Sequence, residues 1–204
     1  MELIGMLDSP YVRRVAVTAQ FLDIAYDHNP LSIFKGYDEF RQVNPLVKVP
    51  MIVSDDGEML VDSTLIIGYL ETLSTNGKCL MPDDAADRFR ALQIIGVALV
   101  AMEKVVALIY ERTQRPKEIQ HAPWIKRLDQ QLRAAVDQLE AIVGDGSSWL
   151  IGADIMQADI SAAIAWRFVQ HAVPRRISAD EYPGLVAFSA RAEALSQFVA
   201  CPLS

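Results

Sequence analysis

The junction Ser9-Pro10 places a hydroxyl between a predicted strand and a predicted helix. The run from Leu3 to Met6 is short and apolar, which is typical of a buried strand. Apolar residues then recur every three or four positions from Val12 to Leu22, which predicts a helix. Serine is a preferred N-cap, and proline suits the first helical position. The hydroxyl would face the free N–H groups and the positive dipole end of that helix, a corner that can hold an anion; a cap without further function is the alternative interpretation.

Two aspartates occupy comparable positions later in the chain. Asp62 and Ser63 follow a short apolar run, and either residue can cap the helix that begins there. Asp159 lies in the first turn of another predicted helix, where a carboxylate favours the helix N-terminus. A capping box would place Ser or Thr three residues earlier, but that residue is Met156. We therefore expect Asp159 to accept hydrogen bonds from main-chain N–H groups of the preceding loop.

Metal and disulfide chemistry are not predicted. The cysteines form no CxxC pair, and the histidines lack the spacing of metal ligands; these residues are Cys79, Cys201, His28, His121 and His171. The low number of cysteines indicates a reducing compartment, and both thiols are expected to be inert. No histidine and aspartate pair is evident that would activate Ser9 as a covalent nucleophile.

Composition restricts the function classes further. Of the 204 residues, 51% are hydrophobic, which is enough for a substantial core, and the net charge is −7. No basic block of five or more residues occurs, so neither nucleic acid nor an anionic membrane is an expected partner. No signal peptide is expected, and the longest charge-free apolar stretch, about Ala91 to Met102, is too short to cross a bilayer. We predict a soluble cytoplasmic protein.

The first part of the chain is predicted to form a small mixed sheet. The turn Asp55-Asp56-Gly57 between two short apolar runs is a hairpin signal. The strand–helix–strand opening implies a parallel pair with a right-handed crossover, and the whole order is β-α-β-α-β-β-α. After the first helix we expect a strand over Ile24–His28, a short helix over Asp38–Val43, strands over Met51–Val53 and Met59–Val61, and a helix from Asp62-Ser63.

The second part of the chain contains no convincing strand. The stretch near Ser74 to Ala85 has Gly, Pro, Asn and paired Asp without periodicity, which is typical of a linker. We therefore predict an α/β domain over residues 1–75, a linker over 76–84 and an all-α domain over 85–204. Its four helices are expected from about Ala85 to Arg115, from near Pro123 to Gly144, from Met156 to before Pro174, and after Pro183-Gly184.

Four local signals, in this order, resemble the glutathione transferase superfamily. They are S-P-Y-x-R-R-V from Ser9 to Val15, N-P followed by V-P at Asn44-Pro45 and Val49-Pro50, D-S before an apolar helix from Asp62 to Leu70, and G-x-D-x-x-x-A-D-I from Gly152 to Ile160. The resemblance covers nearly the whole chain and is to a serine-type, bacterial-like member. It implies a thioredoxin-like domain followed by a helical bundle, usually a homodimer, in a cytoplasmic enzyme of detoxification.

The resemblance also implies how glutathione would be bound as co-substrate. Ser9 matches the residue that donates a hydrogen bond to the glutathione sulfur. Val49 matches the residue before a cis-proline, here Pro50, whose backbone pairs with the cysteinyl part. Asp62 and Ser63 match the acidic residue and the hydroxyl that hold the γ-glutamyl amine and carboxylate. Basic side chains that commonly meet the glycyl carboxylate are matched by Lys35 and Lys48.

Two departures from the family pattern stand out. Val47 is found where many members have glycine, and Met156 replaces the capping hydroxyl. Arg13 and Arg14 are either surface charges or interface contacts, and the sequence does not decide between them. Four apolar or aromatic residues at helical spacing are either core residues or the lining of a pocket for the electrophile: Tyr11, Met102, Tyr110 and Trp166.

The resulting hypothesis is a glutathione transferase that conjugates glutathione to a hydrophobic electrophile. A free thiol has a pKa of about 8.5, and lowering it by about two units requires roughly 2.7 kcal/mol of preference for the thiolate. A charge-assisted hydrogen bond contributes roughly 1.5–3 kcal/mol and a helix N-terminus about 0.3–1 kcal/mol, so a serine donor suffices without a metal. The alternative is a non-catalytic module of the same fold that binds proteins or ligands. A disulfide reductase is disfavoured because no cysteine lies near Ser9.

Overall fold

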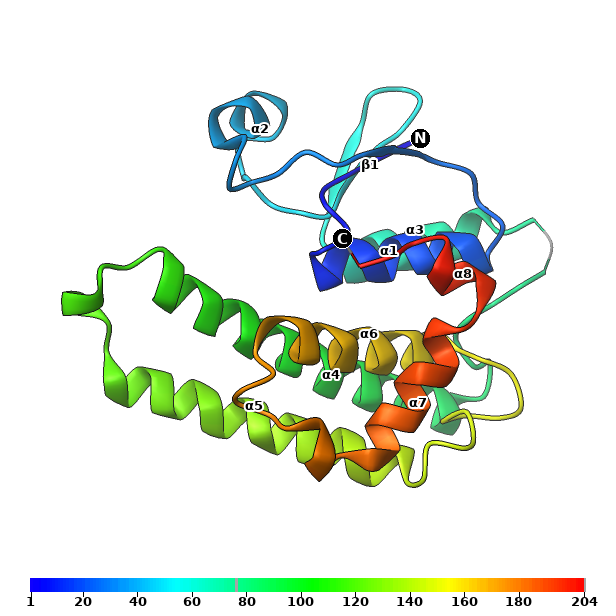
Figure 1. Cartoon of the computed structure of the whole chain (residues 1–204). Helices are drawn as coiled ribbons and strands as arrows, with labels where there is room; N and C mark the ends of the chain where they lie inside the picture. Colours follow the sequence, from blue (N-terminus) through cyan, green and yellow to red (C-terminus); the bar gives the residue numbers. More distant parts are fainter. Residues whose placement is uncertain (76, 204) are drawn as a thin grey trace. The chain divides into compact units, whose positions relative to one another are not determined.

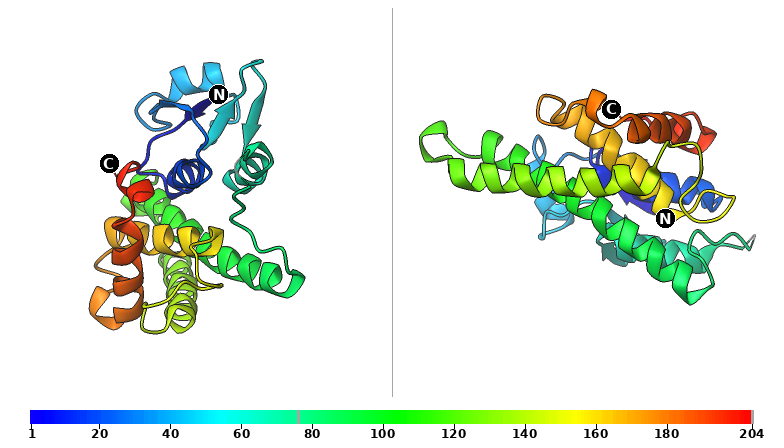
Figure 2. Two further views of the ribbon diagram at one scale, coloured as in Figure 1. Left: turned by 90° about the vertical axis from the view of Figure 1, so that its right-hand side faces the viewer. Right: turned by 90° about the horizontal axis from the view of Figure 1, so that it is seen from below.

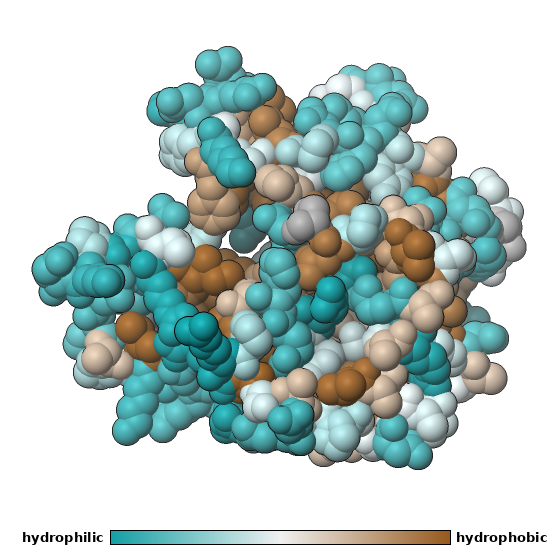
Figure 3. Space-filling model, viewed as in Figure 1, coloured by the Kyte–Doolittle hydropathy of each residue, from teal (hydrophilic) through white to brown (hydrophobic). Residues whose placement is uncertain are grey.

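The computed structural model describes residues 1–75 and 77–203. These residues form two compact units, one built from 1–80 and 194–204, the other from 81–193. The predicted linker begins at residue 76, which lies outside the described residues, as does residue 204, the last of the predicted all-α domain. Apolar side chains interrupt the hydrophilic surface of both units (Figure 3).

The first unit is built on a four-stranded sheet of order β2-β1-β3-β4. Figure 1 labels strand β1 and the helices of this unit. Strand β1 pairs in parallel with β2 and antiparallel with β3, which pairs antiparallel with β4. The described elements are β1 (Glu2–Ile4), α1 (Pro10–Phe21), β2 (Asp27–Asn29), α2 (Tyr37–Val43), β3 (Met51–Val53), β4 (Met59–Val61), α3 (Ser63–Leu73) and α8 (Ser196–Val199). The predicted mixed sheet and its thioredoxin-like order are confirmed.

The strand expected over Ile24–His28 lies further along the chain, at Asp27–Asn29. The reason is the end of α1. Asp23 has a φ of 55°, and the N–H of Ile24 donates to the carbonyl of Ala19 at 2.9 Å. This hydrogen bond uses Ile24 to close the helix, so the chain becomes extended only afterwards.

The core of the first unit lies between the sheet and its helices. Helix α1 is buried along most of its length and packs against α3, while Ile4, Phe40 and Met51 form a cluster around the sheet. Leu3 and Ile52 are also buried, and they are partners in the β1–β3 register. Burial of these side chains holds the strand ends in fixed relative positions.

Residues 194–203 group with the first unit, whereas the sequence pattern places them with the helices of an all-α domain over 85–204. Residues 194–204 return to α1, where the Arg13 Nε donates to the Cys201 carbonyl at 2.8 Å. The rings of Phe21 and Phe198 meet edge to face, with centroids 6.2 Å apart. The Cys201 thiol is buried, and burial raises its pKa, which keeps it protonated.

The second unit is entirely helical among the described residues. It contains α4 (Ala85–Thr113), the 3₁₀ turn η1 (Lys117–Ile119), α5 (Ala122–Val143), α6 (Gln157–Ala172), the 3₁₀ turn η2 (Ala179–Glu181) and α7 (Pro183–Glu193). Helices α4 and α5 lie side by side, and α4 also packs against α6 (Figure 2). In length and hydropathy α4 would suffice to span a membrane, but the helix is the central packing element of this unit.

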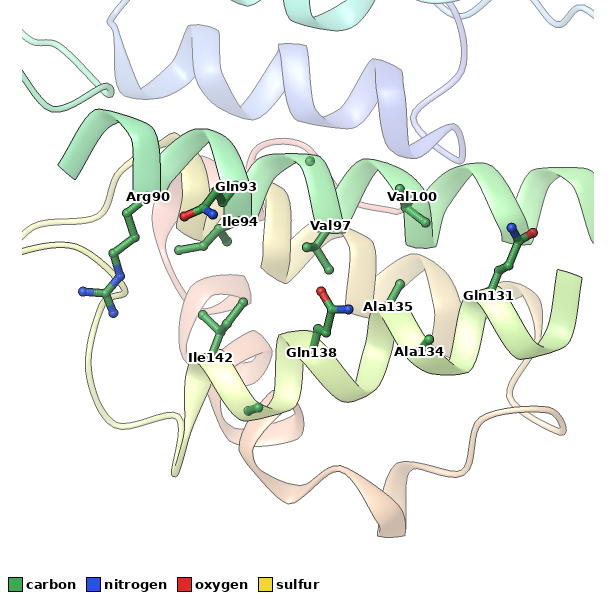
Figure 4. A pocket seen from close by; sticks show the side chains of 12 residues that line it. Arg90, Gln93, Ile94, Val97, Val100, Gln131, Ala134, Ala135, Gln138 and Ile142 are labelled. Carbon is green, nitrogen blue, oxygen red and sulfur yellow. The ribbon is translucent and has the colours of Figure 1, made fainter. Parts of the chain in front are cut away.

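A groove of about 870 Å³ lies between α4 and α5 (Figure 4). Gln93, Ile94 and Val97 of α4 face Gln138 and Ala135 of α5 across it, with Arg90 near one end. Its walls combine small aliphatic residues with side-chain amides, so it is only moderately apolar.

The loop before α6 is organised by Asp159, as the missing capping hydroxyl predicts. The N–H of Leu150 donates to Asp159 Oδ1 and the N–H of Met156 donates to Oδ2, both at 2.8 Å. Asp159 is fully buried. Burial raises the pKa of its carboxyl, and the two backbone donors oppose that rise. The carboxylate therefore ties the loop and the helix together from inside the unit.

Candidate functional site

The sheet register brings three separate segments to one edge. Ile4 is paired with Met51, and Met51 with Val61. The end of β1, the start of β3 and the end of β4 therefore coincide, because antiparallel partners run in opposite directions. Ser9 follows β1, Val49-Pro50 precedes β3, and Asp62-Ser63 follows β4. The five residues predicted to contact glutathione most directly are thus attached to the same edge.

Ser9 caps helix α1 and is partly exposed. Its backbone is extended, with φ −72° and ψ 121°, and its Oγ accepts a hydrogen bond from the N–H of Val12 at 3.4 Å. This hydrogen bond is long. A hydroxyl has one hydrogen to donate and two lone pairs, so accepting from Val12 leaves the hydrogen available. Capping and donation to a ligand are therefore compatible at Ser9.

Gly5 lets the Ser9 segment approach the segment before β3. Its φ is +131°, and a Cβ at this position would lie 2.6 Å from Val12 Cγ2 and 3.2 Å from Val49 Cβ. Only glycine adopts this backbone conformation readily and leaves room for both side chains. The absent side chain therefore sets the distance between Val49 and the first turn of α1.

Replacing Gly5 by alanine is expected to destabilise the protein by about 2–4 kcal/mol, through the unfavourable φ and overpacking against Val12. Urea denaturation measures this. Gly57→Ala is the matched control, because Gly57 also has a positive φ, +84°, but a Cβ there meets nothing within 4 Å. In the control variant the free energy of unfolding is expected to fall by only about 1–2 kcal/mol. Equal losses in both variants would contradict the packing role of Gly5.

The peptide bond between Val49 and Pro50 is cis, which confirms that prediction. The loop before it is arranged by Asn44, which is buried. Its Oδ1 accepts from the N–H of Leu46 at 2.9 Å, and its Nδ2 donates to the carbonyl of Lys48 at 3.4 Å. Val47 has a φ of 47°, in the left-handed region that favours glycine. This conformation explains why glycine suits that position in the pattern from which Val47 departs.

Asp62 and Ser63 begin helix α3 with different exposure. Asp62 is exposed, has φ 75° and ψ 124°, and accepts a hydrogen bond from the N–H of Thr64 at 2.9 Å. Ser63 is buried, and its Oγ accepts from Arg14 Nη1 at 3.0 Å. A non-glycine residue at this φ is strained, and such strain is concentrated at functional sites. The pair therefore presents an exposed carboxylate next to a buried hydroxyl that is hydrogen-bonded to Arg14.

Arg13 and Arg14 are not surface charges, since both are 1% exposed. Arg13 Nε reaches the Cys201 carbonyl, as described above. Arg14 Nη1 donates to the hydroxyls of Ser63 and Thr64 at 3.0 and 3.1 Å. Burial lowers the pKa of Arg14 to about 10, while Asp62 and Tyr11 oppose the shift. The guanidinium therefore stays charged at neutral pH. Sequence reasoning missed this role; the signal was two adjacent arginines within an otherwise apolar helix.

The two lysines are exposed and lie apart from these contacts. Lys48 is two residues before Pro50, and Lys35 is in the loop between β2 and α2, where its N–H donates to Ser32 Oγ at 3.2 Å. No described contact joins either ammonium group to Ser9 or Asp62. Their contact with a glycyl carboxylate stays a prediction.

The residues considered for an electrophile pocket do not share one environment. Tyr11 is half-buried in the first unit, and the other three belong to the second. Met102 is fully buried, and Trp166 is 4% exposed with its ring 5.7 Å from that of Tyr182. Both are core residues here. Tyr110 is 40% exposed, so Tyr11 and Tyr110 are the two that keep surface for a ligand.

Across the described ranges 1–75 and 77–203, no group of three or more His, Cys, Asp or Glu side chains is arranged to hold a metal ion. The side chains at the sheet edge include the hydroxyls of Ser9 and Ser63, the exposed carboxylate of Asp62 and, behind Ser63, the buried guanidinium of Arg14.

Sequence and structure comparisons agree on one family. Residues 3–77 match the N-terminal domain of glutathione S-transferases, and residues 122–191 match the C-terminal domain. Maleylacetoacetate isomerase of Pseudomonas aeruginosa is 30% identical over 152 residues, which cover 71% of this chain and 68% of that protein. The uncharacterized GST-like protein YibF of Escherichia coli is 24% identical over 174 residues, 85% of each chain.

A solved structure of a glutathione transferase has the same fold as this chain. A glutathione transferase family member from Pseudomonas fluorescens, with bound glutathione, is 27% identical and superposes with a TM-score of 0.85. The match covers 100% of this chain and 98% of that one. With both domain models matched in order and a relative of 30% identity over two thirds of its length, the chain belongs to the glutathione S-transferase family.

Proposed function

We propose that the protein binds glutathione at the shared sheet edge of the first unit and conjugates it to a hydrophobic electrophile. The observation that carries this proposal is the convergence of Ser9, Val49-Pro50 and Asp62-Ser63 at that edge through the registers of β1, β3 and β4. The family supports it, as does the bound glutathione in the Pseudomonas fluorescens relative.

Each segment would hold a different part of the tripeptide. The main chain at Val49 would pair with the cysteinyl backbone and fix the sulfur near Ser9. The exposed carboxylate of Asp62 suits the γ-glutamyl ammonium. The Ser63 hydroxyl and the N-terminus of α3 suit the γ-glutamyl carboxylate, because helix N-termini favour anions. With these contacts made, the sulfur is the one reactive group of the ligand left toward the electrophile.

Activation of the sulfur would come from Ser9. Its hydroxyl would donate to the sulfur and stabilise the thiolate over the thiol, and the N-terminus of α1 would add to that preference. The thiolate then attacks the electrophile, a carbon–sulfur bond forms, and the leaving group departs with its electron pair. No general base is required on the protein if the thiol proton is lost to water on binding.

The test is glutathione binding followed by turnover. Calorimetry or thermal shift with millimolar glutathione measures binding, and a chloronitrobenzene electrophile measures conjugation. We expect both. Absence of binding at millimolar glutathione would refute the proposal, whereas binding without turnover on a panel of electrophiles would support the non-catalytic module instead.

Replacing Asp62 by asparagine is expected to weaken glutathione binding about tenfold without unfolding the protein. Asparagine tolerates a positive φ and can still cap α3, but it carries no charge for the ammonium group. The solvent exposure of Asp62 keeps the effect modest. Calorimetric titration measures it, with Asp56→Ala in the exposed hairpin turn as control. If glutathione bound equally well to Asp62→Asn and the control, Asp62 would be only a helix cap.

We also propose that the protein is a homodimer. The outer face of α3 supports this, because Leu65, Tyr69 and Leu73 recur every four residues and are exposed. The open groove between α4 and α5, which is only moderately apolar, is a second candidate surface. The mass of the protein in solution, by analytical ultracentrifugation, decides between dimer and monomer.

A further inference from the structure

Arg14 is a buried cation that is hydrogen-bonded to the first residues of α3. It lies on α1, five residues after Ser9, and its side chain is almost fully buried. The Nη1 atom donates to two hydroxyls at once, those of Ser63 and Thr64, at 3.0 and 3.1 Å. Burying a guanidinium is costly unless it is hydrogen-bonded, and the two hydroxyls of α3 accept such bonds from Nη1.

These hydrogen bonds determine the direction in which Ser63 can donate. A guanidinium has only donors, so the Ser63 oxygen must accept from it. The single hydrogen of the Ser63 hydroxyl is then directed to another acceptor. An anion at the N-terminus of α3 would be such an acceptor, and it would also be attracted by the positive charge behind the hydroxyl.

The neighbouring carboxylate has the complementary arrangement. Asp62 accepts from the N–H of Thr64 and is exposed, so its remaining lone pairs suit a cation. A donor hydroxyl backed by a guanidinium, beside an exposed carboxylate, matches a ligand that carries an ammonium and a carboxylate on one carbon. An α-amino acid group has this arrangement.

We propose that Arg14 is a positioning residue for the α-amino-acid end of glutathione, because it holds the Ser63 and Thr64 hydroxyls as donors toward the α-carboxylate. The inference rests on the proposed function and deepens it. It separates two roles of the same edge: Ser9 acts on the sulfur, and Arg14 acts through Ser63 and Thr64 on the opposite end of the tripeptide.

A structural tie between α1 and α3 is the competing explanation, and a pair of ligands separates the two. One ligand is glutathione. The other is the analogue with 4-aminobutyrate in place of γ-glutamate, which keeps the amine and lacks the α-carboxylate. We expect the parent protein to bind glutathione more tightly than this analogue. In Arg14→Met that preference should fall about tenfold or more, because only the carboxylate contact is lost.

Arg13→Met is the matched control. Arg13 is equally buried on the same helix, but its Nε contact is to the Cys201 carbonyl rather than to α3. The preference for glutathione over the analogue should be unchanged in this variant even if its melting temperature falls. Should Arg14→Met fail to fold, Arg14→Lys keeps the charge with a single donor group, and its preference should still fall severalfold.

The results distinguish a failure of the proposed glutathione binding from a failure of the proposed role of Arg14. A parent protein that binds no glutathione overturns the proposed function and this inference with it. A parent that binds glutathione, with an undiminished preference in Arg14→Met or, if that variant is unfolded, in Arg14→Lys, overturns only the inference. An equal loss of affinity for both ligands in the Arg14 variant also overturns it and leaves Arg14 as a structural tie.

Discussion

Replacing Ser9 by alanine is expected to lower the rate of conjugation at pH 7 by about 3-fold to 25-fold while glutathione still binds. A charge-assisted hydrogen bond from a hydroxyl contributes roughly 1.5–3 kcal/mol, which corresponds to one to two units in the pKa of the bound thiol. The pH–rate profile of kcat/KM should therefore move to higher pH by that amount, and the rate at high pH should approach that of the parent.

Two further substitutions separate this effect from helix capping. Alanine at an N-cap costs about 0.5–2 kcal/mol, whereas glycine costs only a few tenths. Ser9→Gly should therefore conjugate as slowly as Ser9→Ala but keep nearly all of the parent's free energy of unfolding. Ser9→Thr retains a hydroxyl, so it should keep much of the conjugation rate and much of the stability. If Ser9→Gly conjugated at the parental rate, Ser9 would be a cap and the thiolate would be stabilised by other groups.

Replacing Asp159 by alanine should destabilise the second unit by about 3–5 kcal/mol. The variant removes two hydrogen bonds to a buried carboxylate and leaves the N–H groups of Leu150 and Met156 without their acceptor. The loss exceeds that of an ordinary surface substitution because each buried donor then bears its full desolvation cost. Urea denaturation followed by circular dichroism measures it.

Asp154→Ala is the control for Asp159, since Asp154 is exposed in the same loop. Its effect should be within about 0.5 kcal/mol of zero. Asp159→Asn should fall between the two, because an amide oxygen can still accept one of the two hydrogen bonds. A loss for Asp159→Ala as small as that of Asp154→Ala would show that the loop finds other acceptors.

Short sequence patterns predicted much of the structure where the residues of the pattern contact their own near neighbours in the chain. The hairpin strands are at Met51–Val53 and Met59–Val61 as expected, since the turn between them fixes their register. Asp159 was predicted to bond the preceding loop because Met156 lacks a capping oxygen, and the carboxylate does so. Both interactions join residues no more than ten positions apart.

The sequence left questions open where distant segments meet. Buried Arg13 is hydrogen-bonded to the carbonyl of Cys201, which is 188 residues away. No local sequence pattern predicts that contact. Arg14 is buried because Ser63 and Thr64 lie across from it, 49 and 50 residues later. Met102 and Trp166 have the spacing of either a core or a pocket, and only packing decides between these.

The return of residues 194–204 to the first unit has a consequence for synthesis of the protein. The all-helical segment 81–193 is made between the two parts of the first unit. At 5–20 residues per second, the ribosome needs on the order of 10 s to make it. During that interval α1 lacks the ring of Phe198 and the carbonyl of Cys201, so the helix that Ser9 caps acquires these packing partners only after the second unit has been made.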